Sequence, residues 1–305
     1  MIGRRGRGRG RSDTTERGII APADWRRGRV RWSMLIIQAA VLLFLIVVCL
    51  GPILWMVKSA VTPTQDTLRY PMALWPSGID LGQLERAWSV THIDRYLLNT
   101  VVIAAGSWLI QLVVATTAGF ALSVLQPRLG GLLTGLVVAT LFVPPIVLLV
   151  PLYLTVVQVP IGTKGLIDSY WAIWLPAAAS AVNVILIKRF FDNLPREIFE
   201  AARVDGAGPL RLFWSIVLPL SRPILGVVSI FAITATWKDY LWPLLVIRNP
   251  NLQPLSVRLP TLQSSTDLGV FIAALAISSL IPILLFLAFQ RWFLNGAGFG
   301  GAIKG

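Results

Sequence analysis

The chain has 305 residues, of which 55% are hydrophobic and only 13% charged, and its mean hydropathy is +0.72. These values exclude an ordinary soluble globular domain, in which charged residues make up about a quarter of the chain. The composition instead predicts a polytopic membrane protein, and much of the formal net charge of +13 lies in an N-terminal tail.

The N-terminal tail is the first element in chain order. Residues 1–30 are rich in Arg and Gly, and the run RRGRGRGR occupies Arg4–Arg11. Such a run can bind nucleic acid, but a long apolar segment begins further on, at Trp32. We therefore predict a disordered, basic, cytoplasmic tail whose partner is anionic membrane lipid and not nucleic acid.

Six apolar segments follow within residues 31–305. Each is long enough to cross about 30 Å of hydrocarbon as a helix, and a backbone in lipid must satisfy its own hydrogen bonds, so all six are predicted to be helical. The third is over-long; we expect a helix over about 131–157, kinked by Pro144, Pro145 and Pro151. The predicted fold is an all-α membrane domain with spans at 32–57, 96–126, 129–163, 169–187, 223–247 and 268–290.

Lys and Arg residues give the orientation of these spans. With the N-terminus inside, the inner segments hold 19 basic residues and the outer loops hold 7. Because cytoplasmic loops carry the excess of basic residues, both termini and the 188–222 loop are predicted to be cytoplasmic.

The polar 188–222 loop carries the most informative pattern. Glu-Ala-Ala is followed by three residues, then a glycine, nine residues and Ile-x-Leu-Pro; the fixed positions are Glu200, Ala201, Ala202, Gly206, Ile216, Leu218 and Pro219. We expect a short helix with Pro195 in its first turn and Asn193 or Leu194 as the cap. The alternative is an ordinary cytoplasmic helical hairpin.

The expected helix has one face suited to a protein contact. Ile198, Ala201 and Ala202 are spaced to share a face, and small residues there would let a partner approach the backbone. Gly206 is expected to end the helix as a left-handed cap.

This spacing resembles the EAA signature of the permease subunits of bacterial ABC importers. Over roughly residues 35–305 the chain is similar to the second permease subunit of carbohydrate-uptake importers, of the maltose-permease type. The similarity includes Leu98-Asn99-Thr100, Pro151-Leu152-Tyr153, Trp237-x-Asp239-x-x-x-Pro243-Leu244 and the final six residues Gly-Gly-Ala-Ile-Lys-Gly. Lys238 stands where that family commonly has Asn, which leaves the usual substrate contact of the fifth span in doubt.

The resemblance implies a type I importer in a bacterial inner membrane. Its parts would be a second permease subunit, two ATPase subunits and an extracytoplasmic sugar-binding protein. The chain contains no G-x-x-x-x-G-K-[ST] phosphate loop, so ATP and Mg are expected on the ATPase subunits. This chain is predicted to be no enzyme and to bind no cofactor, and the seven fixed loop residues are expected to couple it to the ATPase.

The family resemblance alone predicts a sugar or oligosaccharide as cargo. Candidate pathway residues are Gln111, Asn183, Trp237 and Asp239, although each could equally pack or pair between helices. The coupling loop indicates a partner ATPase and does not indicate which solute is transported. Amino acids, phosphate or polyamines are therefore alternatives.

Two interpretations from other classes are weaker. A secondary transporter would need ionisable residues within the spans, and only Lys238 and Asp239 qualify. A membrane enzyme is the second, but one histidine, His92, and one cysteine, Cys49, give no catalytic or metal-binding framework.

Overall fold

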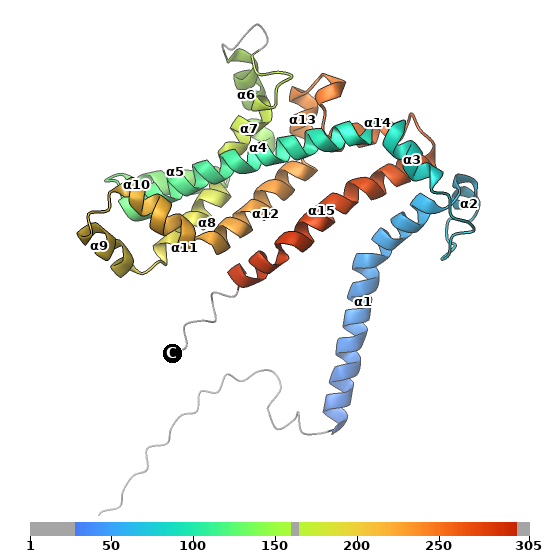
Figure 1. Ribbon diagram of the computed structural model, residues 1–305, viewed down its shortest axis with the longest axis horizontal. Coiled ribbons are helices and arrows are strands. Elements are labelled where there is room, and N and C mark those ends of the chain that lie inside the picture. The colour runs from blue at the N-terminus through green and yellow to red at the C-terminus, as the bar shows by residue number, and fades with distance from the viewer. Residues whose placement is uncertain (1–27, 160–164, 298–305) are drawn as a thin grey trace, which may run out of the picture. The chain divides into compact units, whose positions relative to one another are not determined.

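Every regular element is a helix in the computed structural model, which describes residues 28–159 and 165–297 (Figure 1). The predicted 1–30 tail and the final six residues lie almost wholly outside the described residues. The longest helices are α1 (Gly28–Val61), α4 (Ile93–Phe120), α12 (Arg222–Lys238) and α15 (Leu268–Ala297).

Shorter elements connect these helices. They are α2 (Thr64–Arg69), α3 (Gly82–Ser89), η2 (Ala121–Leu125), α5 (Gly130–Thr140), α6 (Pro145–Gln158), α7 (Trp171–Ala178), α8 (Ala181–Asp192), α9 (Arg196–Val204), α10 (Pro209–Leu212), η3 (Phe213–Val217), α11 (Leu218–Leu220), α13 (Leu241–Val246), η4 (Pro250–Leu252) and α14 (Leu255–Leu262).

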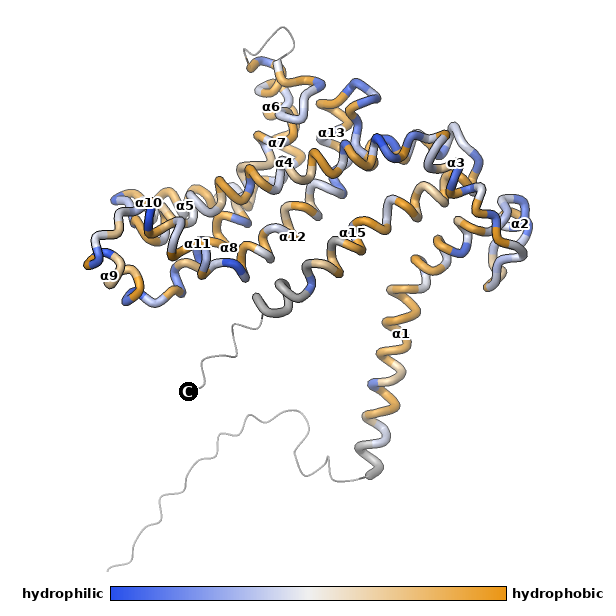
Figure 2. The backbone as a smooth tube through the Cα atoms, in the orientation of Figure 1, coloured by the Kyte–Doolittle hydropathy of each residue, from blue (hydrophilic) through white to orange (hydrophobic). Residues whose placement is uncertain are grey.

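Helix α4 is the central packing element of residues 56–297. It packs against α7, α8 and α12, and α12 in turn packs against α15. Hydroxyl groups buried in α4 bond back to its own carbonyls, as when Thr116 Oγ1 donates to Leu112 O at 2.7 Å. Most apolar side chains of α1 are exposed, and hydrophobic residues run along its length (Figure 2).

Three helical segments are long and apolar enough to cross a membrane unbroken: Trp32–Val61, Ile93–Leu125 and Leu268–Ala288. Three further candidates are bent pairs: Gly130–Thr140 with Pro145–Gln158 at 104°, Trp171–Ala178 with Ala181–Asp192 at 43°, and Pro209–Leu220 with Arg222–Lys238 at 79°. The predicted number of six spans is reached when each bent pair counts as one span, although the last pair begins at Pro209, within the predicted 188–222 loop.

Proline residues lie at two of the bends. A proline also leaves one helical carbonyl group without its usual N–H donor, and in α7 the structure supplies another donor. Pro144 is the N-cap of α6 and Pro145 its first residue, so the predicted kink is a complete break between α5 and α6. Pro176 cannot donate to the carbonyl four residues earlier, that of Ala172. The indole Nε1 of Trp242 donates to that carbonyl instead, at 2.9 Å.

The predicted continuous fifth span, 223–247, is wrong in its outer part. Helix α12 ends at Lys238, and Asp239 is extended with φ −69° and ψ 122°. Pro243 has no N–H for the Asp239 carbonyl, and Ser256 Oγ donates to that carbonyl at 2.6 Å. A separate short helix, α13, therefore follows.

Candidate functional site

Helix α9 forms the centre of the predicted coupling loop. Pro195 precedes it at the N-cap position without a side-chain cap, so the expected placement of Pro195 inside the first turn was off by one residue. Asn193 does not cap α9: its Nδ2 donates to Arg189 O at 2.9 Å and closes the end of α8. Glu197 in the first turn suits the positive end of the helix dipole.

Gly206 ends α9 in the left-handed conformation predicted from the sequence, with φ +76°. The N–H of Ala207 donates to Ala202 O at 2.9 Å, and that of Gly206 donates to Arg203 O at 3.0 Å. This pair of bonds defines a Schellman motif, which needs a residue with positive φ at this position. A Cβ on Gly206 would meet no atom within 4 Å, so the requirement for glycine comes from the backbone alone.

The face predicted to meet a partner, with Ile198, Ala201 and Ala202, is not one surface in the structure. Phe199 and Ala202 are buried in a core of the chain's own side chains that includes Phe191 and Phe213. Ala201 and Glu200 are exposed. The two alanines therefore point in different directions, because the large ring of Phe199 selects which side of α9 packs inward.

The segment that leads from α9 back to the membrane packs against the same core. Ile216 and Leu218 are half-buried against it, whereas Pro219 is exposed. Leu218 N–H donates to Phe213 O in a π-helical turn directly before Pro219, which has no N–H to offer. The chain then bends by 79° into α12.

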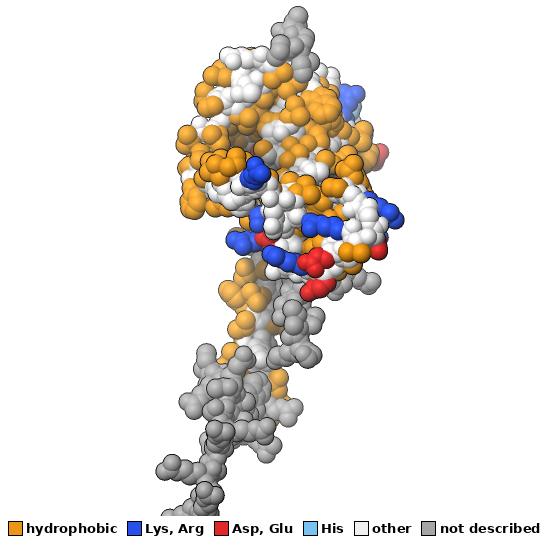
Figure 3. Space-filling model, turned by 90° about the vertical axis from the view of Figure 1, so that its left-hand side faces the viewer, with side chains coloured by type: hydrophobic (Ala, Val, Ile, Leu, Met, Phe, Trp, Pro, Cys, Tyr) orange, Lys and Arg blue, Asp and Glu red, His pale blue; other side chains and the backbone are white. Residues whose placement is uncertain are grey.

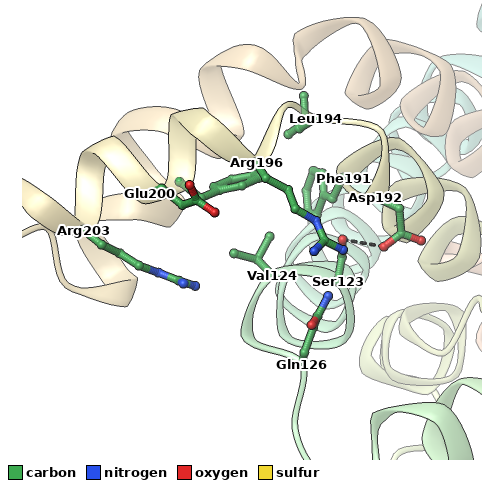
Figure 4. Close-up of a pocket in the computed structure, with 10 residues that line it drawn as sticks. Ser123, Val124, Gln126, Phe191, Asp192, Leu194, Arg196, Glu200 and Arg203 are labelled. Carbon is green, nitrogen blue, oxygen red and sulfur yellow. Dashed lines mark hydrogen bonds between the residues drawn. The ribbon is translucent and has the colours of Figure 1, made fainter.

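A polar pocket of about 270 Å³ lies between α9 and the ends of η2 and α8 (Figure 4). Arg196, Glu200 and Arg203 line one side of it and are spaced to form a single stripe along the helix. Across the pocket, Asp192 accepts hydrogen bonds from Ser123 Oγ at 2.7 Å and Lys188 Nζ at 2.8 Å. This network ties the end of η2, which continues α4, to the end of α8 next to α9.

The outward surface of the loop combines charge with unusually exposed apolar side chains. Val204 is 88% exposed, Leu210 76% and Trp214 66%. Acidic and basic side chains gather on this face beside hydrophobic ones (Figure 3). A surface of this composition can dock a protein, because the apolar side chains gain from burial and the charges add specificity.

The first two pathway candidates are brought together by the structure. Gln111 on α4 and Asn183 on α8 are both buried, and Asn183 Nδ2 donates to Gln111 Oε1. Their side chains therefore join two helices within this chain.

Trp237 and Asp239 lie elsewhere, at the break between α12 and α13. Both are half-buried. Trp237 and Lys238 line an apolar pocket of about 220 Å³ with Pro282 and Phe286 of α15. The four pathway candidates thus do not form one site within this chain.

Some residues of the site were missed by sequence reasoning. Phe199, one position from Ile198, is the anchor of α9, and the three-residue spacing between Phe199 and Ala202 was the available signal. The Ser123–Asp192 bond joins residues 69 positions apart, and no local pattern reveals such a pair.

Helices long and apolar enough to cross a membrane, joined by a polar helical loop, define a polytopic membrane protein. Comparison with known proteins identifies the family. Residues 111–296 match the family described as "Binding-protein-dependent transport system inner membrane component". The chain belongs to this family and is the permease component of an ABC importer in the inner membrane.

Individual relatives cover most of the chain. The probable ABC transporter permease protein YurM of Bacillus subtilis is 32% identical over 91% of each chain. The sn-glycerol-3-phosphate transport system permease protein UgpE of Pectobacterium atrosepticum is 32% identical over 78% of this chain and 86% of its own. The melibiose/raffinose/stachyose import permease protein MelC of Bacillus subtilis is 29% identical over 76% and 84%.

A solved structure supports the fold. One chain of a bacterial ABC transporter involved in the import of the acidic polysaccharide alginate matches with a TM-score of 0.77 and 20% identity, covering 91% of this chain and all of that one. The predicted all-α ABC importer permease is confirmed, in preference to a secondary transporter or a membrane enzyme. The chain is thus the transport component of its complex and not the ATPase.

Proposed function

We propose that this chain forms half of the translocation pathway for a sugar or oligosaccharide, and that its 188–222 loop couples this pathway to an ATPase. The names of its relatives support the cargo class, because they include a permease for melibiose, raffinose and stachyose and permeases for sn-glycerol-3-phosphate. Amino acids, phosphate and polyamines remain the competing cargo classes.

The proposed assembly contains a second permease subunit, two ATPase subunits that bind ATP and Mg, and an extracytoplasmic sugar-binding protein. Both termini and the loop face the cytoplasm in this proposal. The 19 basic residues of the inner segments, against 7 outside, support that orientation.

The observation that carries the coupling proposal is the division of α9 into two faces. Its inner face, with Phe199 and Ala202, is buried in a core that also contains Phe120 of α4 and Val228 of α12. Its outer face presents Glu197, Ala201 and Val204 to solvent. A partner that binds the outer face therefore moves the inner core and the ends of α4 and α12 with it.

The mechanism is a two-state equilibrium that the ATPase biases. Closure of the ATPases favours one position of α9, and the shared core passes that displacement to the spans. Glu200 and Ala201 contact the partner, Ala202 and Gly206 fix the position and the end of the helix, and Ile216, Leu218 and Pro219 direct the chain back into the membrane.

The four pathway residues have two kinds of role in this proposal. Gln111 and Asn183 hold α4 against α8 beside the pathway, as their mutual hydrogen bond favours. Trp237 offers an aromatic face and Asp239 a hydrogen-bonding carboxylate at the helix break, groups that suit a sugar ring with its hydroxyls.

Uptake by the reconstituted complex, with its binding protein, tests the cargo class. Proteoliposomes are supplied with ATP inside and with a panel of labelled neutral oligosaccharides, sn-glycerol-3-phosphate, amino acids, phosphate and polyamines outside. We expect ATP-dependent accumulation of an oligosaccharide. Accumulation of sn-glycerol-3-phosphate, an amino acid, phosphate or a polyamine, with no oligosaccharide taken up, would refute the cargo proposal and leave the permease assignment intact.

A further inference from the structure

The segment between α1 and α3 forms a loop that is closed at the end of a membrane helix. The candidate span Trp32–Val61 ends where this loop begins, and α2 forms its first part. At the other end, Asp80 N–H donates to Val61 O at 2.7 Å, and Gln83 Nε2 donates to Thr62 O at 2.8 Å. Residues 62–80 therefore leave and rejoin the terminus of α1 (Figure 1).

The tip of this loop is apolar and exposed. Residues 70–79 read YPMALWPSGI and contain no charged residue. Four large side chains project from them with high exposure, a set that we call the apolar tip: Met72 84%, Leu74 77%, Trp75 83% and Ile79 75%. Soluble surfaces rarely gather so many exposed apolar side chains within ten residues, and such a patch marks an interaction site.

The two attachments at the end of α1 restrict how far the tip can lie from the membrane boundary. Trp75 is five residues from Asp80, so even a fully extended chain places it within about 17 Å of that attachment. The interfacial layer on each side of the hydrocarbon is about 5–8 Å thick. The tip is therefore within reach of this layer, and burial in it removes apolar surface from water.

We propose that the apolar tip inserts into the interfacial layer of the membrane at this end of α1, with phospholipid as its partner. The residues that border the tip fit this partner. Tyr70 lies beside Arg69, whose guanidinium is 5.8 Å from the ring centroid, and an aromatic ring paired with a basic group is typical of the headgroup level. Asp66 and Asp80 lie on either side of the tip in the sequence. Together with Arg69 they leave the border with little net charge, which suits zwitterionic lipid.

The inserted tip fixes the outer end of α1 against the bilayer. The hydrogen bond from Ser77 Oγ to Asp66 Oδ2, at 2.5 Å, closes the tip upon α2, so that the tip, α2 and the end of α1 move together. The proposal depends only on the chain being a membrane protein, and not on its cargo or its coupling loop.

The experiment places a fluorophore on the tip of the complete importer in phosphatidylcholine nanodiscs. Cys49, the one native cysteine, is replaced by Cys49→Ser, and a polarity-sensitive probe is attached after Trp75→Cys or, separately, Met72→Cys. Glu85→Cys on the exposed surface of α3 is the matched control. We expect a blue-shifted emission at both tip positions, and several-fold stronger quenching by nitroxide-labelled phosphatidylcholine than by iodide, with the reverse order at Glu85.

Two results would overturn the proposal. Stronger quenching by iodide at both tip positions would show that the tip lies in water. Protection from iodide that appears only when the binding protein is added would show that the tip docks a protein instead of lipid. Using two labelled positions keeps the test valid if the loss of Trp75 itself weakens insertion.

Discussion

The coupling loop and the α12–α13 break both interrupt helices near prolines, but they satisfy their free backbone groups in different ways. Around α9, the backbone closes itself through the Schellman bonds at Gly206 and the π-helical turn before Pro219. At the α12–α13 break, a distant side chain, Ser256, supplies the missing donor to Asp239 O.

This difference determines which side chains remain available for a partner. Arg196, Glu200 and Arg203 on α9 line a pocket, and within the part of the chain that the structure describes they form no ion pair. Ser256 at the α12–α13 break, in contrast, is bonded to the carbonyl of Asp239. A helix break that the backbone closes by itself leaves side chains for function, whereas one that needs a side-chain donor commits that side chain to the fold.

The largest expected effect separates the two alanines of α9. Ala202→Trp forces a large ring into the core beside Phe199, and we expect a loss of at least about 3 kcal/mol of stability, at the upper end of overpacking costs. Ala201→Trp leaves the stability unchanged, because Ala201 is exposed, but removes ATPase binding.

Thermal unfolding and co-purification of the ATPase are measured for both alanine variants. A native unfolding midpoint for Ala202→Trp would show that Ala202 does not face the core. Retained ATPase binding by Ala201→Trp would show that the outer face of α9 is not the docking face.

The buried amide pair gives an intermediate effect. Asn183→Leu leaves Gln111 Oε1 buried without its donor, at a cost of about 1–3 kcal/mol. The double variant with Gln111→Leu removes both polar groups and should recover most of this loss. Stability in detergent gives the coupling energy, which is about 0.6–1.7 kcal/mol for such pairs in membranes; strictly additive losses would contradict a structural role for the pair.

The smallest effect is expected at the α12–α13 break. Ser256→Ala removes the donor to Asp239 O and should cost about 1 kcal/mol without changing which solutes are transported. Ser264→Ala, on the exposed surface after α14, is the control. A native unfolding midpoint for the Ser256 variant would show that this hydrogen bond does not stabilise the break.

Much of the fold and the centre of the site could be predicted from the sequence. The length of each apolar segment located the spans, because the thickness of the hydrocarbon layer fixes the number of residues that a spanning helix requires. The left-handed conformation of Gly206 could also be predicted, since few other residues end a helix in this way.

The inward face of α9 and the partners of broken helices could not be predicted. Ile198 and Phe199 are neighbours, and only packing against the core that contains Phe191 and Phe213 selects the aromatic ring. The bond from Trp242 to Ala172 spans 70 residues. Such contacts depend on how helices pack, which local spacing does not encode.

Gly206 offers the most direct test of the claim that α9 couples transport to the ATPase. A β-branched residue at φ +76° costs about 1–3 kcal/mol of backbone strain, so Gly206→Val displaces the end of α9. Gly206→Asn tolerates positive φ, and Gly208→Val places the same side chain at φ −70° and ψ 167° with open space around it.

The measurement is ATP-driven uptake by the reconstituted complex, with membrane insertion and bound ATPase quantified for each variant. We expect Gly206→Val to insert normally and lose uptake, while Gly206→Asn retains most of it and Gly208→Val transports like the native protein. Native uptake by Gly206→Val with the ATPase bound would contradict the account, because the end of α9 would then play no part in coupling.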